Sequence, residues 1–281
     1  MSNTPLRKIV EYYDGFAEEN RLTTGSGQLE FERTKELLGR SLPPSGLIVD
    51  VGGGSGAYGF WLASLGYAVH LIDATPRLAN EASRRNNASK HPLTAVTIGD
   101  ARHLEVADVS ADVVLLLGPL YHLTTRGDRV TALQEARRIL RPGGVLAAAG
   151  ISRYAATLDG LAHPALDTRL ATMRQRSLPD GQYRNDSGDP RYFTTAYFHR
   201  PEDLADEVAE AGFIDVGVFG IEGPGWLLTD FEARWADADG RAEILNVARL
   251  LEGERSVVGM SAHLMAVGTR PLQPGEPVDV P

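Results

Sequence analysis

The sequence predicts an α/β fold built on a doubly wound, mostly parallel sheet, and three observations support this prediction. Short runs of apolar and β-branched residues recur along the chain, segments of helical periodicity separate most of them, and glycine-containing turns follow several. Strands that alternate with helices in this way form parallel sheets joined by crossover connections. With 281 residues, 43% of them hydrophobic and 23% charged, the chain can bury at least one substantial core.

Residues 1–46 are predicted to form a helical cap ahead of the sheet. Apolar residues recur at helical spacing between Leu6 and Leu38, which indicates two helices. The segment Gly25-Ser26-Gly27 separates these helices, and Pro43-Pro44-Ser45-Gly46 ends the second one before the first strand.

Residues 47–270 are predicted to form one domain that holds the sheet and two insertions. We expect strands at 47–51, 68–72, 94–98, 112–117, 145–149, 213–221 and 261–269, and helices at 57–65, 77–86, 129–140 and 201–211. Cap insertions are expected at about 152–199 and 223–254, the second of them largely helical. The tail, residues 271–281, contains four prolines and scattered acids and is predicted to be disordered.

A glycine-rich turn after the first predicted strand indicates a ligand site. The turn reads Asp50-Val51-Gly52-Gly53-Gly54-Ser55-Gly56, which lets the backbone approach a nucleotide while helical N–H groups face it. Asp73 lies about 20 residues further on, at a strand end, where a carboxylate accepts hydrogen bonds from ribose hydroxyls. These features indicate an adenosine-containing cofactor. Because Gly52, Gly54 and Ala57 also fit a dinucleotide fingerprint, a nicotinamide-dependent oxidoreductase stays open as an alternative.

Three further motifs follow in order along the chain. The third strand ends at Gly99-Asp100-Ala101, the fourth runs into Gly118-Pro119-Leu120-Tyr121-His122, and Leu140-Arg141-Pro142-Gly143-Gly144 precedes the fifth. Together with the glycine turn and Asp73, they make the chain resemble the class I S-adenosylmethionine-dependent methyltransferases, of the type that acts on small molecules. The resemblance covers residues 47–150 closely and the later strands loosely.

The resemblance implies a seven-stranded, Rossmann-like sheet whose last two strands, at 213–221 and 261–269, form an antiparallel hairpin. It also implies that S-adenosyl-L-methionine binds at the turn and leaves as S-adenosyl-L-homocysteine. Gly52 and Gly54 would approach the methionine portion, Asp73 the ribose, and Asp100 with Ala101 the adenine. The predicted cofactor-binding residues are Asp50, Gly52, Gly54, Asp73, Asp100, Ala101, Leu117, Arg21 and Tyr13.

Methyl transfer is an in-line displacement, so the protein has to align the acceptor, exclude water and keep the accepting lone pair unprotonated. His122, with Tyr121 beside it, follows the fourth strand and is the candidate general base for an oxygen acceptor. A packing role for His122 carries equal weight. The N-terminal helix with Tyr13 is expected to close over the cofactor, with Arg21 either pairing with the cofactor carboxylate or remaining in solvent.

Four residues of the insertions are candidates for the acceptor site. Tyr197 and His199 belong to an aromatic run that otherwise serves core packing, and Glu222 with Trp226 pairs an acid with an aromatic ring, as a cationic amine requires. The insertions provide enough chain to enclose the site, which favours a small acceptor. The acidic and aromatic candidates favour an amine nitrogen as the methylated atom, and His122 keeps an oxygen acceptor as the alternative. A binding or regulatory protein that holds the cofactor without chemistry is the second alternative.

Composition and motifs limit the kinds of molecule that the protein is expected to bind. A net charge of −9 disfavours nucleic acid, and the Gly118 segment lacks the leading Asp or Asn and the second proline of the motif in DNA amino methyltransferases. The chain has no cysteine and no paired metal-ligand motif, so no metal is expected. Without an apolar run of membrane-spanning length, we expect a cytoplasmic protein with no membrane partner. The oligomeric state stays open.

Overall fold

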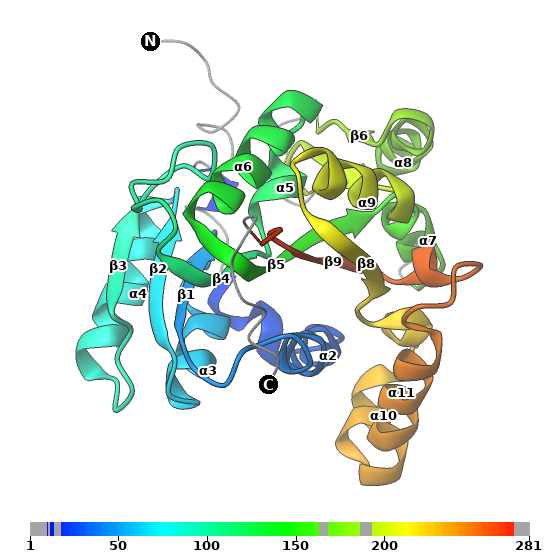
Figure 1. The fold of residues 1–281 in the computed structure, drawn as a ribbon. Helices are drawn as coiled ribbons and strands as arrows, with labels where there is room; N and C mark the ends of the chain where they lie inside the picture. The colour runs from blue at the N-terminus through cyan, green and yellow to red at the C-terminus, as the bar shows by residue number, and fades with distance from the viewer. Residues whose placement is uncertain (1–9, 11, 14–17, 163–167, 186–192, 273–281) are drawn as a thin grey trace.

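A nine-stranded sheet runs through the part of the molecule that the computed structural model describes, namely residues 10, 12–13, 18–162, 168–185 and 193–272 (Figure 1). Its strands are β1 (Leu47–Val51), β2 (Ala68–Asp73), β3 (Ala95–Ile98), β4 (Ala111–Leu116), β5 (Leu140–Ser152), β6 (Gln182–Tyr183), β7 (Ala196–His199), β8 (Ile214–Gly220) and β9 (His263–Thr269). Seven of them correspond to the strands expected from the sequence.

The strand order places β1 and β4 side by side at the point where ligands bind in such sheets. Strands β3, β2, β1, β4 and β5 lie side by side and parallel. Strand β9 is inserted antiparallel between β5 and β8, which confirms the predicted antiparallel end of the sheet. Since the order reverses direction between β1 and β4, a crevice opens there at the carboxyl ends of the strands, where open α/β sheets bind their ligands.

Two features of the sheet differ from the prediction. Strand β5 begins at Leu140 rather than at 145, because Leu140 already pairs with Ala111 of β4 and the pairing resumes at Val145 after an irregularity, within which Gly143 adopts a φ of 77°. In addition, the first insertion contributes β6 and β7, and β7 continues the sheet by pairing in parallel with the end of β5. Such short strands carry too few residues for a periodic signal.

Helices cover both faces of the sheet (Figure 1). They are η1 (Glu18–Thr23), α2 (Gly27–Gly39), α3 (Ala57–Ser64), α4 (Pro76–Ala88), α5 (Pro119–His122), α6 (Arg126–Ile139), α7 (Ala155–Ala162), α8 (Thr168–Asp180), α9 (Pro201–Glu210), η2 (Gly223–Leu227), α10 (Phe231–Ala236), α11 (Ala238–Leu251) and η3 (Val258–Met260). Helices α6 and α9 pack on one core through Leu133 and Val208, whereas α2, α3 and α4 pack on the other. The sheet is therefore doubly wound, as predicted.

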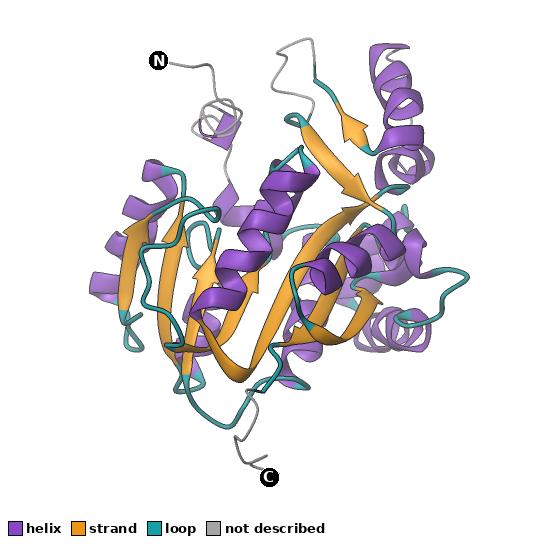
Figure 2. Ribbon diagram, turned by 45° about the horizontal axis from the view of Figure 1, so that its top comes forward, coloured by secondary structure: helices purple, strands orange, loops and turns teal. Residues whose placement is uncertain are grey.

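The insertions form additional layers at the far edge. The first contributes α7, α8 and the β6–β7 hairpin, which extends beyond the main sheet in Figure 2. The second is largely helical, as expected, and Phe231 and Trp235 of α10 pack with Ile244 of α11 against Leu29 of α2.

The division of the chain into an N-terminal cap and a methyltransferase-type domain stays a prediction. Most of the first predicted helix and most of the predicted tail lie outside the described residues. In the described residues, every helix is too short or too polar to cross a membrane.

Candidate functional site

A cavity lies where the loops after β1, β2, β3 and β4 meet, and it gathers the residues that the sequence singled out for a cofactor. The structure brings all nine of them to its wall, together with both candidate catalytic residues: Tyr13, Arg21, Asp50, Gly52, Gly54, Asp73, Asp100, Ala101, Leu117, Tyr121 and His122. This first cavity is thus assembled from segments that are up to about a hundred residues apart in the chain, as loops on a parallel sheet allow.

The glycine turn follows β1 directly and needs glycine for its backbone. Gly52 and Gly54 adopt φ angles of 74° and 57°, in the left-handed region that side chains disfavour. The N–H of Gly52 donates to the carbonyl of Ile72 at 2.7 Å, which fixes the turn against the end of β2. A Cβ atom on Gly52 would lie 2.7 Å from the ring of Pro119. Close approach of two loops therefore requires glycine here.

Asp73 ends β2 with its carboxylate turned towards the glycine turn. Its two oxygens accept the backbone N–H groups of Gly54, at 2.8 Å, and of Thr75, at 2.7 Å. Burial raises the pKa of Asp73, and these hydrogen bonds oppose that shift. Because each carboxylate oxygen has a second acceptor position, Asp73 remains able to bind hydroxyl groups in the cavity.

Asp50 lies beneath the turn and is the most unusual carboxyl group of the first cavity. Its Oδ2 is buried and has no hydrogen-bond partner in the described part of the chain. Burial and the nearby charge of Asp73 raise the pKa of Asp50 to about 7, against a hydrogen bond from the backbone of Gly59. This oxygen lies inside the turn, 2.7 Å from where a Cβ atom on Gly53 would stand, so Asp50 supports the turn from within rather than presenting Oδ2 to the cavity.

Asp100 lies on the opposite wall and is held by a neighbouring arginine. Nη2 of Arg102 donates to Oδ2 of Asp100 at 2.6 Å, and Nη1 of Arg102 reaches Asp128 at 3.0 Å. Burial raises the pKa of Asp100, but the hydrogen bonds from Arg102 outweigh it and leave the pKa below its ordinary value. The ionised carboxylate is therefore fixed in orientation next to the buried Ala101.

His122 ends α5 and faces the first cavity as a neutral imidazole. Burial lowers its pKa to about 3. Its Nε2 and the hydroxyl of Tyr13 are hydrogen-bonded at 2.9 Å, and the two rings pack edge to face. Arg77 donates through Nη2 to the carbonyl of Tyr13 at 2.8 Å. These bonds hold Tyr13 in the wall of the cavity.

A second cavity adjoins the first and has a volume of about 380 Å³, within the range of small-molecule sites. The two cavities share Tyr13, Arg21 and Tyr121, so these side chains stand between them. Most of the remaining wall is apolar or aromatic and includes Trp226, one of the predicted acceptor residues, and Phe193. The arrangement provides two adjoining compartments, one below the glycine turn and one beneath the insertions.

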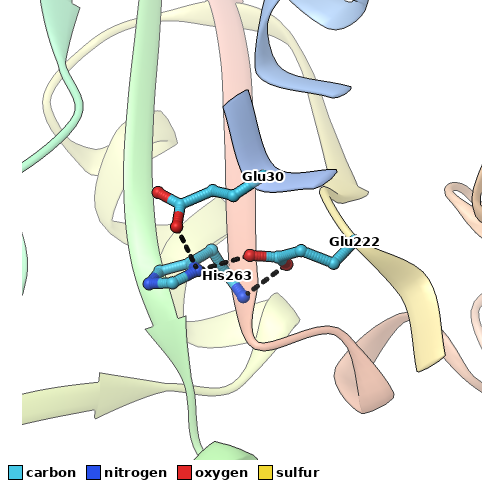
Figure 3. Close-up of side chains that lie close together, drawn as sticks. All are labelled: Glu30, Glu222 and His263. Carbon is cyan, nitrogen blue, oxygen red and sulfur yellow. Dashed lines mark hydrogen bonds and ion pairs between the residues drawn. The ribbon is translucent and has the colours of Figure 1, made fainter. Parts of the chain in front are cut away.

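Buried charges gather beside the second cavity (Figure 3). The ring Nδ1 of His263 lies 2.6 Å from Oε1 of Glu222 and 3.7 Å from Oε2 of Glu30. Burial lowers the pKa of His263, but the charges of Glu30 and Glu222 outweigh it and raise the pKa to about 9. Arg21 donates to both oxygens of Glu30, at 2.5 and 3.0 Å. Two cations therefore neutralise two carboxylates.

These three residues, Glu30, Glu222 and His263, also offer metal-ligand atoms within 4.8 Å of one another. A metal ion would have to displace the His263 proton and compete with Arg21 for Glu30, since ligands bind metals in their deprotonated form. The hydroxyl of Ser261 donates to Glu222 at 2.7 Å as well. The cluster is already satisfied internally, and the absence of a resident metal stays a prediction.

The structure does not bring Tyr197, His199 or Glu222 to either cavity wall. His199 is fully buried, with Nε2 3.3 Å from Glu207, and Tyr197 packs beneath Arg129, whose Cζ lies 3.6 Å from the ring centre. Glu222 is buried behind His263. Tyr197 and His199 thus pack against α6 and α9, whereas Phe193 and Phe198 of the same aromatic run line the second cavity.

Several residues that sequence analysis missed line the second cavity. These residues, which lie in segments without a motif, are Tyr12, Asp159, Arg174, Tyr183 and His263. A single histidine at the start of the last strand carries no sequence signal. Only the fold shows that β9 is inserted beside β5 and brings His263 next to α2 and the segment after β8.

Comparison with known proteins agrees with this geometry. Residues 49–148 match the sequence model of a methyltransferase domain family. The chain is 34% identical over 139 residues to a dimethylglycine N-methyltransferase of Parasynechococcus marenigrum, covering 46% of each chain. It is 32% identical over 190 residues to a malonyl-[acyl-carrier protein] O-methyltransferase of Geobacter sulfurreducens, covering 67% of this chain and 63% of that protein. The chain thus spans about half the length of the curated relatives it matches.

Solved structures show the same fold. A protein of Methanosarcina mazei described as an S-adenosylmethionine-dependent methyltransferase superposes with a TM-score of 0.57, at 16% identity, over 84% of this chain and 98% of its own. The first of the two relatives above methylates nitrogen and the second methylates oxygen, judging from their names. The comparisons therefore agree on a methyltransferase domain at residues 49–148, but the relatives differ in the atom that they methylate.

Proposed function

This chain carries a class I S-adenosylmethionine-dependent methyltransferase domain, and from that premise we propose that it transfers a methyl group to a nitrogen or oxygen of a small molecule held in the second cavity. The observation that carries the proposal is the wall shared by the two cavities, formed by Tyr13, Arg21 and Tyr121. Adjoining compartments with a common wall let donor and acceptor meet in line while water is excluded.

The first cavity suits the cofactor of this family. Bound S-adenosylmethionine supplies the electrophilic methyl group of its sulfonium. Gly54 lines this cavity and has open space where its side chain would stand, which leaves room for a ligand next to the turn. In this proposal Asp73 binds the ribose hydroxyls, and Asp100 with the backbone at Ala101 binds the adenine. Gly52 and Leu117 shape the floor of the same cavity.

Arg21 lines both cavities and could bind the carboxylate of the cofactor. However, it already forms an ion pair with Glu30, which neutralises its charge. We therefore assign Arg21 to the shared wall, where Glu30 holds it in place. Hydrogen bonds with His122 and Arg77 hold Tyr13 in the same shared wall.

His122 lines the first cavity, and Tyr121 lines both cavities. With a pKa of about 3, His122 is neutral at physiological pH but is a weak base, since a general base works best when its pKa lies near the working pH. We assign His122 to holding the Tyr13 hydroxyl. Alignment and exclusion of water by the aromatic wall then carry the reaction, which suits an amine that reaches the site unprotonated.

Two measurements test the proposal. Isothermal titration with S-adenosylmethionine is expected to show binding, and titration with NAD(H) to show none. Incubation with labelled S-adenosylmethionine and a panel of small amines and hydroxy compounds is then expected to give S-adenosylhomocysteine together with a methylated product. Binding of NAD(H) in place of S-adenosylmethionine would overturn the cofactor assignment. Cofactor binding without turnover on any acceptor would favour the regulatory alternative.

A further inference from the structure

The wall of the second cavity exposes basic groups and hides most of the acids that neutralise them. Arg21, Arg174 and His263 line the cavity, whereas Asp159 is the one carboxylate among the described lining residues. The partners of Arg21 and His263, which are Glu30 and Glu222, are buried behind the wall. A bound molecule therefore meets the cationic side of these pairs first.

His263 is oriented so that one ring nitrogen remains available. Its Nδ1 faces Glu222 and Glu30, and Figure 3 shows the other nitrogen, Nε2, pointing away from both carboxylates. In the described part of the chain no hydrogen bond reaches Nε2, and 22% of the side chain is exposed. An imidazolium held in this way has one N–H to donate to a ligand.

Arg174 of α8 offers a second unused donor on the same wall. Its Nη2 donates to Oδ2 of Asp159 at 2.7 Å. Its Nε is buried and out of reach of a ligand. Arg174 lines the second cavity, and its Nη1, which is not buried, has no hydrogen bond in the described residues, so Nη1 is the donor that a ligand can meet. Guanidinium groups bind carboxylates and phosphates through two parallel N–H donors.

We propose that His263 and Arg174 form a subsite for an oxyanion, either a carboxylate or a phosphate ester, on the small molecule that occupies the second cavity. Glu222 acts as a positioning residue by fixing the His263 ring. The identification of this molecule as the methyl acceptor rests on the function proposed above. The subsite itself rests only on the wall of the cavity, and the aromatic side chains opposite accommodate an apolar body.

Matched aromatic probes test the subsite without requiring turnover. Benzoate, phenyl phosphate and benzamide have similar rings and differ in the anionic group. We expect calorimetry on the protein saturated with S-adenosylhomocysteine to show that benzoate or phenyl phosphate binds at least about tenfold more tightly than neutral benzamide, as for a charge-assisted hydrogen bond. Whichever anion binds more tightly identifies the source of the oxyanion. Equal affinity for all three probes overturns the proposal.

Variants locate the binding. His263→Gln and Arg174→Gln are each expected to reduce affinity for the anion about tenfold or more and to leave benzamide binding unchanged. His91→Gln, on an exposed residue, is the matched control and should change neither. If both cavity variants keep full affinity for the anion, the subsite is refuted. Retained S-adenosylhomocysteine binding and unchanged circular dichroism show that the variants are folded.

The pH dependence adds a readout that a purely structural role would not give. The charged groups facing His263 are Glu30 of α2, Glu222 after β8 and Arg21 of η1. Anion affinity should fall as the pH rises through about 9, where the imidazolium of His263 loses its proton. In Glu222→Gln the fall should move to lower pH, because one stabilising charge is gone. An unchanged pH profile in this variant contradicts the positioning role of Glu222.

The outcomes for the subsite and for the proposed function are distinguishable. Anion binding that depends on His263, found without methyl transfer to any acceptor, supports the subsite and counts against the enzyme function. Methyl transfer to acceptors that lack an anionic group, with rates unaffected by His263→Gln, supports the function and refutes the subsite.

Discussion

Replacing His122 with asparagine is expected to remove part of the acid sensitivity of folding. In the folded protein burial lowers the pKa of His122 to about 3, whereas the unfolded chain binds a proton at a histidine below about pH 6.5. Between these values the unfolded state holds more protons, so the free energy of unfolding falls as the pH drops through this window. The stability that depends on neutral His122 is therefore fully present above about pH 6.5.

The size of the effect follows from the two pKa values. Between about pH 6.5 and about pH 5 the unfolded state holds about one more proton at this site than the folded state, and each pH unit of this window, roughly 1.5 units wide, corresponds to about 1.4 kcal/mol. Between about pH 8 and pH 5 the wild type should thus lose about 2 kcal/mol more than His122→Asn. Asparagine keeps a polar group beside the hydroxyl of Tyr13, so the comparison isolates the titration rather than the lost ring.

Urea unfolding at both pH values measures this difference for the wild type, His122→Asn and the control His91→Asn, whose residue is exposed. The control should follow the wild type. If the stability of His122→Asn falls with pH in parallel with the wild type, His122 titrates normally in the folded protein. The argument for a neutral, weakly basic histidine in the wall of the first cavity is then refuted.

Three other substitutions test the site and its scaffold. Asp73→Ala should weaken S-adenosylmethionine binding by roughly tenfold or more in calorimetry while affecting turnover at saturation less, because ribose contacts are made in ground and transition states alike; an unchanged dissociation constant removes Asp73 from the site. Gly52→Ala should lower both stability and cofactor affinity, by about 1–3 kcal/mol in urea unfolding, since its Cβ would lie 2.7 Å from the Pro119 ring, whereas Gly39→Ala, with open space, should be nearly neutral. Glu207→Gln should destabilise the fold by about 3–5 kcal/mol, because it leaves the buried guanidinium of Arg129, whose Nη2 lies 2.6 Å from Oε1 of Glu207, without its counter-charge. A loss below about 1 kcal/mol would show that the Arg129–Glu207 pair is solvated.

The sequence predicted much of the cofactor cavity because its residues lie in a regular local order. A strand, a glycine turn and a helix, followed by Asp73 and Asp100 at later strand ends, place their side chains at one edge once the strands are parallel. Residues 47–150 follow this pattern closely. The positive φ angles at Gly52 and Gly54 are the kind of constraint that a sequence records directly.

The second cavity and the chemistry of its wall depended on tertiary structure. Sequence reasoning assigned Tyr197 and His199 to the acceptor, but strand β7 directs them against Arg129 and Glu207. It gave no reason to choose His263. Side chains in insertions are placed by the surface against which they pack, and no local periodicity encodes that surface.

The sequence by itself determined the fold class, the order of helices and strands in the first half of the chain, and the residues that gather at the first cavity, because these follow from local periodicity and backbone constraints. Only the tertiary structure decided what faces the second cavity. Burial and neighbouring charges are properties of assembled segments, so they alone set His122 as a neutral group and His263 as a cation between Glu30 and Glu222.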